Sequence, residues 1–75
     1  MIKRKKIESS ILTSIGYDNE SKTLEIEFKK NKQIRQYHNF PKDEWDEFVS
    51  TDSQGLYFLK YIKDKYDELR FAKSN

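Results

Sequence analysis

The sequence contains no cysteine, one proline and two glycines in 75 residues. Without cysteine the chain can form neither a disulfide nor a thiolate metal site, and this absence fits a reducing cytoplasm. No apolar run approaches the roughly 20 residues of a membrane-spanning helix, and the first residues lack the apolar region of a signal peptide. We therefore expect a cytoplasmic protein that makes no membrane contact and folds without covalent cross-links.

Apolar residues are also scarce, at 35% of the chain, whereas aromatic residues make up 15%. A chain of this length buries only about 60–65% of the surface that it exposes when unfolded, so we expect a single domain with a narrow stability margin. Large rings must supply much of the buried area, because each covers far more surface than an alanine. The sequence thus predicts one small domain with an aromatic core.

The charges are unevenly distributed along the chain. Residues 1–6 contain basic residues and no acid, namely Lys3, Arg4, Lys5 and Lys6. They lack the apolar content of a folded segment, and we predict that residues 1–6 form a basic flexible arm. Residues 41–54 are acidic, with one lysine against five acidic residues. The arm is either a solubilising tail or a contact for phosphate, because clustered lysines attract polyanions.

Three segments have the pattern of β-strands. β-branched and aromatic residues are dense from 7 to 18, and Gly16 within them indicates a bulge or a close backbone approach. Residues 24–28 alternate strictly between apolar and acidic side chains, which is typical of a strand with one buried face. Short polar turns separate these segments from each other and from a third one at 34–40. Short connections favour an antiparallel meander.

Two helices are predicted after the strands. Pro41 marks the change, because its fixed φ suits the first turn of a helix. Apolar residues at 45–49 are spaced three and four apart and form the stripe of a first short helix. Asp52 or Ser53 is the expected N-cap of a second, longer helix.

The predicted fold class is α+β: a three-stranded antiparallel β-meander followed by two α-helices packed on one face. The domain should span residues 7–71, and residues 72–75 should fray. Gly55 near the start of the second helix costs about 1 kcal/mol relative to alanine, so we expect close packing of this helix against the sheet that demands it. The predicted core consists of Ile11 or Leu12, Ile15, Leu24, Ile26, Phe28, Phe40, Trp45, Phe48, Phe58, Ile62 and Tyr66.

Four segments carry a recognisable family pattern. They read SSILTSIGYD, LEIEF, YHNFP and DSQGLYFLKYIKDKY, at residues 9–18, 24–28, 37–41 and 52–66. Their order and spacing resemble the KTSC domain, a module named for the carboxyl terminus of some lysyl-tRNA synthetases and also found as stand-alone bacterial and phage proteins. The most specific part is Ser-x-Gly-x-x-Phe followed by Ile and Tyr, here Ser53, Gly55, Phe58, Ile62 and Tyr66. The resemblance implies the fold of that family, for which RNA binding is the suggested function.

No catalytic pattern is present in the sequence. His38 is the only histidine, and no cysteine is available to pair with it. The first predicted helix contains four acidic residues without a nearby histidine, and we interpret them as a solvated face: Asp43, Glu44, Asp46 and Glu47. A Gly-rich phosphate loop is also missing. We therefore predict a binding module rather than an enzyme, with no metal and no cofactor.

The first candidate ligand is RNA or another single-stranded nucleic acid. Lysines can hold phosphates, while arginine and aromatic side chains on a sheet can stack unpaired bases. The predicted site consists of Lys3, Arg4, Lys5, Lys6, Arg35, Tyr37 and His38. Two ordinary interpretations remain open: Tyr37 as a ring at the edge of the core, and Arg35 as a cross-strand partner of an acidic residue. The family usually has Tyr-x-Tyr in this strand, and Arg35 occupies the first tyrosine position.

The alternative partner is a protein. An exposed strand edge can add a partner's strand, and aromatic side chains often dominate protein interfaces. The predicted interaction residues are Trp45, Tyr57 and Tyr61. A phage or mobile-element protein of this size could bind and block a host protein in this way. Salt discriminates the two hypotheses, because nucleic-acid affinity falls steeply with salt and a mostly apolar protein contact does not.

Overall fold

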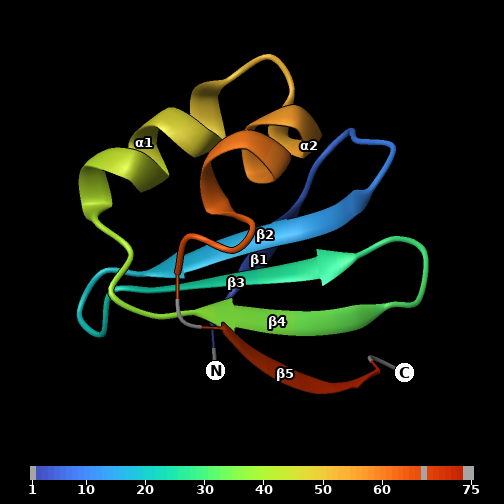
Figure 1. The fold of residues 1–75 in the computed structure, drawn as a ribbon, viewed down its shortest axis with the longest axis horizontal. Helices are drawn as coiled ribbons and strands as arrows, with labels where there is room; N and C mark the ends of the chain where they lie inside the picture. Colours follow the sequence, from blue (N-terminus) through green and yellow to red (C-terminus); the bar gives the residue numbers. More distant parts are fainter. Residues whose placement is uncertain (1, 67, 74–75) are drawn as a thin grey trace.

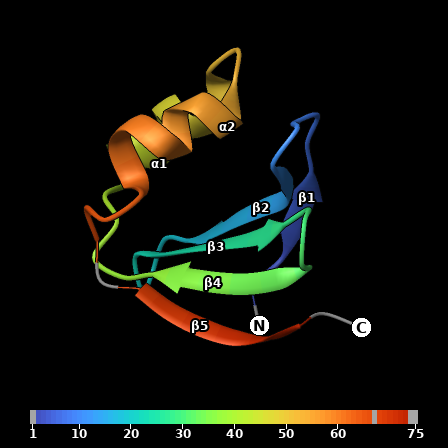
Figure 2. The same ribbon diagram turned by 45° about the vertical axis from the view of Figure 1, so that its right-hand side comes forward.

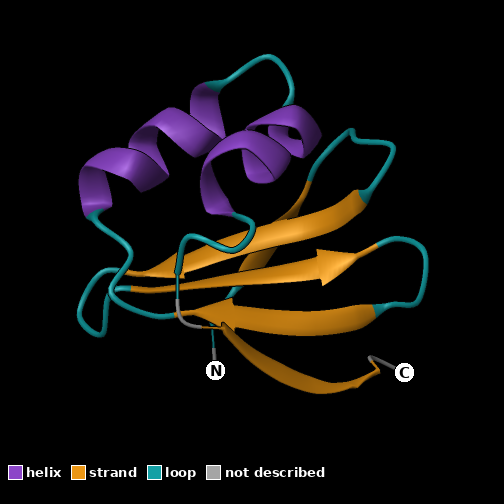
Figure 3. Cartoon of the chain, viewed as in Figure 1, coloured by secondary structure: helices purple, strands orange, loops and turns teal. Residues whose placement is uncertain are grey.

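The computed structural model describes residues 2–66 and 68–73 (Figure 1; Figure 3). The strands are β1 (Arg4–Lys6), β2 (Leu12–Asp18), β3 (Thr23–Phe28), β4 (Gln33–Tyr37) and β5 (Glu68–Lys73). The helices are α1 (Lys42–Ser50) and α2 (Gln54–Tyr57), and α2 continues into the π-helical segment η1 (Phe58–Ile62). No helix within the described ranges is long and apolar enough to cross a membrane.

The five strands form one antiparallel sheet in the order β1-β2-β3-β4-β5. Both helices and η1 lie on one face of it (Figure 2). The predicted α+β class, the antiparallel meander and the position of the helices on one face are therefore confirmed. The predicted number of three strands is wrong, because β1 and β5 extend the meander at its two edges.

Strand β1 occupies half of the predicted flexible arm. Residues 4–6 pair with β2, and Arg4 lies opposite Gly16. A glycine is needed there, because a Cβ atom would lie 2.4 Å from the carbonyl oxygen of Lys3. The close backbone approach predicted at Gly16 is thus confirmed. The prediction of a flexible arm is wrong for residues 4–6, because charged residues can form an edge strand when a partner strand accepts them.

The second helix is shorter than predicted, and the chain returns to the sheet after it. The helical segment ends at Ile62, and Asp64 has a left-handed φ of 63°, which reverses the chain direction. Residues 68–73 then pair with β4. The predicted end of the domain is therefore wrong, since residues 72–73 belong to a strand. Residues 74–75, the remainder of the predicted frayed end, lie outside the described residues.

The start of α2 agrees with the sequence prediction. Ser53 is the N-cap, and its hydroxyl accepts a hydrogen bond from the backbone N–H of Leu56 at 3.3 Å. Gly55 is buried, and a Cβ atom there would lie 3.1 Å from side-chain atoms of Ser9 and Ile11. The glycine therefore allows α2 to approach the loop between β1 and β2, so the close packing is against this loop and not, as predicted, against the sheet.

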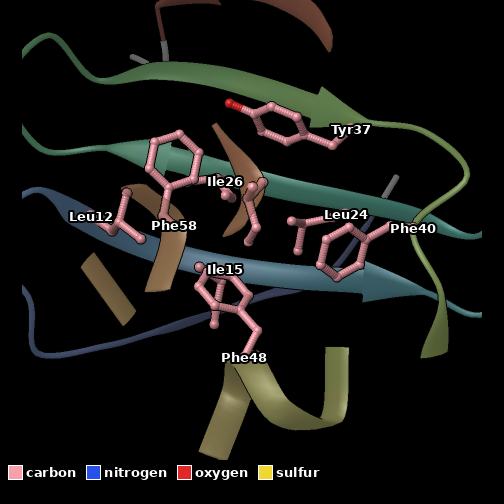
Figure 4. Close-up of a cluster of buried hydrophobic side chains, with 9 residues drawn as sticks. Leu12, Ile15, Leu24, Ile26, Tyr37, Phe40, Phe48 and Phe58 are labelled. Carbon is pink, nitrogen blue, oxygen red and sulfur yellow. The ribbon is translucent and has the colours of Figure 1, made fainter. Parts of the chain in front are cut away.

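Among the residues whose burial is described, nine buried apolar side chains form the core between the sheet and the helices (Figure 4). They are Leu12, Ile15, Leu24, Ile26, Tyr37, Phe40, Phe48, Phe58 and Ile62. All except Tyr37 were predicted. Phe28, Trp45 and Tyr66, which were also predicted, are partly buried and pack against this cluster. In β3 the core side chains Leu24 and Ile26 are two positions apart, as the period of a strand requires. In β2 Leu12 and Ile15 are three positions apart, because the register with β3 is irregular between Leu12 and Ser14.

Candidate functional site

Arg4 belongs to a polar network on the face of the sheet away from the helices. Its guanidinium donates to the Glu25 carboxylate, and its Nε donates to the Ser14 hydroxyl at 2.9 Å. The Glu27 carboxylate lies 3.7 Å from a second guanidinium nitrogen, and Gln36 donates to Glu25 at 2.8 Å. Glu25 is only 5% exposed, so the ion pair fixes β1 to a buried position on the sheet. Arg4 thus has a structural role that the sequence did not indicate.

The other basic residues of the predicted arm are exposed: Lys3, Lys5 and Lys6. Lys5 and Lys6 belong to β1 and lie along an edge of the sheet. They can still meet phosphates, but from the fixed backbone of an edge strand.

The predicted stacking residues of β4 do not share one exposed surface. Tyr37 lies opposite Leu24 on the helix-covered face and is only 1% exposed, so the prediction of an exposed stacking ring is wrong. Its ring instead packs edge-on against Phe58, with centroids 5.9 Å apart. His38 is half-buried, with Nδ1 3.5 Å from the Thr23 hydroxyl and Nε2 buried without a hydrogen-bond partner.

Arg35 lies beside an open cavity of about 500 Å³ at one end of the core. Its guanidinium carbon lies 4.5 Å above the centre of the Phe28 ring, within the range of a cation–π interaction. The Phe28 ring meets Phe58 edge-on, with centroids 5.2 Å apart. Gln33 accepts a hydrogen bond from the Arg35 Nε at 3.1 Å and helps to hold this position. Two aromatic rings and one guanidinium therefore form the inner wall.

The rim of this cavity comes from three other parts of the chain. Lys30 and Asn31 lie in the β3–β4 turn, Leu59 belongs to η1, and Lys63 follows η1 directly. Ser10 and Ile11 from the β1–β2 loop complete the lining. The lining side chains include three cations and, within the described chain, no acid. We call this site the cationic cavity. Sequence analysis predicted only Arg35 of it, because the other residues meet only through the fold.

A second hollow, of about 510 Å³, lies between α1 and the α2–η1 segment. Its lining is acidic and aromatic: Pro41, Asp43, Glu44, Glu47, Tyr57 and Tyr61. Tyr57 donates to the Glu47 carboxylate at 3.0 Å, and its ring lies 4.8 Å from that of Tyr61. Burial, followed by this hydrogen bond, raises the pKa of the Tyr57 hydroxyl well above its ordinary value. We call this site the acidic groove.

Two of the three predicted protein-interaction residues meet in the acidic groove, and the third does not line it. Tyr61 is 51% exposed, whereas Tyr57 is half-buried. Trp45 is half-buried and stacks on Tyr17 with ring centroids 5.4 Å apart and an interplanar angle of 12°. Trp45 therefore acts mainly in packing α1 onto the sheet.

A search of the described side chains finds no group of three or more histidine, cysteine, aspartate or glutamate residues that could hold a metal ion. Two of the surface hollows of the described chain, the cationic cavity and the acidic groove, have opposite charge, and each is of a size that small ligands occupy. The molecule is thus a small α+β module with two candidate binding surfaces.

The chain belongs to the KTSC domain family, whose model matches residues 8–66. An uncharacterized protein from Stutzerimonas stutzeri (strain A1501) is 34% identical over 65 residues, which cover 87% of this chain and 90% of that protein. The crystal structure of a KTSC domain protein from Yersinia pestis is similar with a TM-score of 0.90 at 32% identity. That match covers 96% of this chain and all of the other, so it extends beyond residues 8–66. The family resemblance seen in the sequence is confirmed.

Proposed function

We propose that this KTSC domain is a non-catalytic binding module for single-stranded nucleic acid, with RNA as the first ligand to test. The observation that carries the proposal is the separation of charge on the surface. The β3–β4 turn contributes three exposed lysines, Lys29, Lys30 and Lys32, at one end of the sheet. The acidic side chains of α1 line a different hollow.

The cationic end of the sheet is built from two loops that touch each other. The backbone N–H of Lys29 donates to the Ile11 carbonyl at 2.9 Å, and the Lys29 ammonium donates to the Ser9 carbonyl at 2.6 Å. Figure 1 shows the β1–β2 loop and the β3–β4 turn at the same end of the sheet. Lys6, at the end of β1, precedes the first of these loops. Lys6 and the lysines of the β3–β4 turn can therefore follow one phosphate backbone.

The proposal modifies the site that the sequence predicted. Lys3, Lys5, Lys6 and Arg35 are kept as contacts, whereas Arg4 and Tyr37 hold the fold together. Lysines supply the phosphate contacts, and the cationic cavity offers an unpaired base a wall of rings and a guanidinium.

Fluorescence anisotropy of a labelled single-stranded RNA over a series of salt concentrations tests this function. Log affinity should fall with log salt by about 0.7 per phosphate neutralised. The double variant Lys29→Gln/Lys30→Gln should reduce that slope by about 1.4, twice the single-phosphate value. The control is Lys22→Gln, since Lys22 is an exposed lysine at the opposite end of β3. The proposal is refuted if RNA does not bind at low salt, or if the control and the double variant weaken binding equally.

Protein binding remains the second candidate function, and one observation favours it. The α2–η1 segment exposes three large side chains, Leu56 at 62%, Leu59 at 49% and Tyr61 at 51%. A partner protein, such as the host target of a phage or mobile-element protein, could cover them together with the acidic groove. Such a contact should weaken in Tyr61→Ala, whereas RNA affinity should not change in that variant.

A further inference from the structure

We infer that the cationic cavity is a nucleotide site, which takes one unpaired base against its inner wall and the attached phosphate between Lys30 and Lys63. The inference rests on the proposed function for its choice of ligand. It goes further in assigning one nucleotide to one cavity, so that a free nucleoside monophosphate should bind there.

The inner wall suits a flat aromatic ligand. Phe58 is 3% exposed and is held edge-on against Phe28, so the two rings form a fixed apolar surface. Arg35 lies over Phe28 and has its guanidinium at the cavity. Unpaired bases stack on both ring faces and guanidinium planes in proteins that bind single strands. A base in the cavity would therefore meet surfaces of the right chemistry on its inner side.

The rim suits a phosphate. Lys30 and Lys63 are exposed and line the cavity from two different segments, with the polar Asn31 beside Lys30. Together with Arg35 they place three positive charges around a space that no acid of the described residues lines. An anion entering this space is attracted by all three charges, and the apolar wall lowers the local dielectric and strengthens that attraction.

The volume of the cationic cavity, and the difference in charge between it and the acidic groove, narrow the choice of ligand. The cavity of about 500 Å³ lies within the range of roughly 300–1,000 Å³ that small ligands and cofactors occupy. The acidic groove has nearly the same volume, but three carboxylates line it, so it would repel the same ligand. Of these two sites, only the cationic cavity therefore suits a ligand with one aromatic part and one anionic part.

The first experiment compares adenosine 5′-monophosphate with its two halves, adenosine and inorganic phosphate, in an NMR titration of the amide signals. The monophosphate should bind more tightly than either half and should shift signals of residues 28–35 and 58–63. Equal binding of inorganic phosphate would overturn the inference, because the cavity would then be an anion site only. Tighter binding of dodecanoate, an aliphatic anion, would also overturn it.

Two matched variants localise the site. Leu59 and Leu56 are both exposed leucines of the same helical segment, and only Leu59 lines the cavity. Leu59→Glu places a negative charge at the rim and should weaken monophosphate binding by about tenfold, whereas Leu56→Glu should leave it unchanged. Equal effects of the two variants would overturn the assignment of the cavity. Both variants keep an exposed position exposed, so their folds can be compared by thermal unfolding.

The same variants separate this inference from the proposed function. RNA binding that survives in Leu59→Glu, without any binding of the monophosphate to the native chain, overturns the nucleotide site and leaves the function intact. Monophosphate binding without RNA binding supports the site and removes the function. If the native chain binds neither the monophosphate nor RNA, the nucleotide site and the proposed function are both refuted.

Discussion

The ion pair between Arg4 and Glu25 can be tested by removing one charge at a time. In Arg4→Met the aliphatic stem is kept, while the Glu25 carboxylate, with its side chain 6% exposed, loses its cation. Breaking a buried pair costs about 3–5 kcal/mol, and the 20% exposure of the Arg4 side chain reduces our expectation to about 2–3 kcal/mol. In a domain of this size, that loss lowers the melting temperature by about 10–20 °C.

The double variant Arg4→Met/Glu25→Gln distinguishes the ion pair from simple packing. A neutral amide at position 25 needs no cation, so the double variant should be more stable than Arg4→Met alone. Chemical denaturation of the four proteins of this cycle gives the coupling energy directly. The matched control is Lys5→Met, because Lys5 is an exposed residue of the same strand and should change stability by at most about 0.5 kcal/mol.

The result that would refute the reasoning is equal stability of Arg4→Met and Lys5→Met. Residues 4–6 would then behave as the flexible arm that the sequence predicted. Deletion of residues 1–6 gives a second readout, since it removes β1 and should lower the melting temperature, whereas loss of a mobile arm should not.

Four further predictions concern one core residue, the two glycines and one tyrosine. Phe58→Ala should cost about 3–5 kcal/mol in chemical denaturation, and a loss below about 1 kcal/mol would remove Phe58 from the core. Gly16→Ala should cost about 1–3 kcal/mol, because its Cβ would lie 2.4 Å from a backbone oxygen. Gly55→Ala should destabilise by less than about 1 kcal/mol, because its neighbours at 3.1 Å are side chains and alanine favours the helix; a more stable variant would contradict close packing. Burial raises the pKa of the Tyr66 hydroxyl above the ordinary value of 10.0, and the hydrogen bond that this hydroxyl donates to the Glu44 carboxylate raises it further. The stabilising contribution of Tyr66 is therefore present below pH 10 and is lost as the pH rises further. Unfolding measured from pH 8 to 11 should therefore show an alkaline loss of stability that is smaller in Tyr66→Phe.

The centre of the fold could be predicted from the sequence because its signals are local. Residues 24–28 alternate with a period of two, and the apolar stripe at 45–49 has helical spacing, so the neighbours along the chain identify each element. The core followed from the same patterns. Tyr37 was assigned to the correct segment, but its face depends on the register with β3, and Leu24 lies opposite it only in the folded sheet.

The outer strands could not be predicted because distant residues decide them. Residues 4–6 read as a charged tail, and their pairing depends on Gly16 and Glu25 elsewhere in the sheet. The apolar residues after Ile62 also fit a continued helical stripe, and nothing local indicates that Asp64 takes a left-handed φ. The cationic cavity has the same origin, since its lysines come from the β3–β4 turn and from the end of η1.

The strand order also has a consequence for the folding mechanism. β1 to β4 are consecutive in the chain and joined by short turns, so each of their pairings closes a small loop at low entropic cost. The β4–β5 pairing differs, because Tyr37 pairs with Glu68 and the intervening chain contains both helices. Topologies dominated by local contacts fold fast, and the non-local pairing carries the larger entropic cost of loop closure. We therefore expect the β1–β4 meander to form early in the transition state, with low φ-values for substitutions in β5, which docks last.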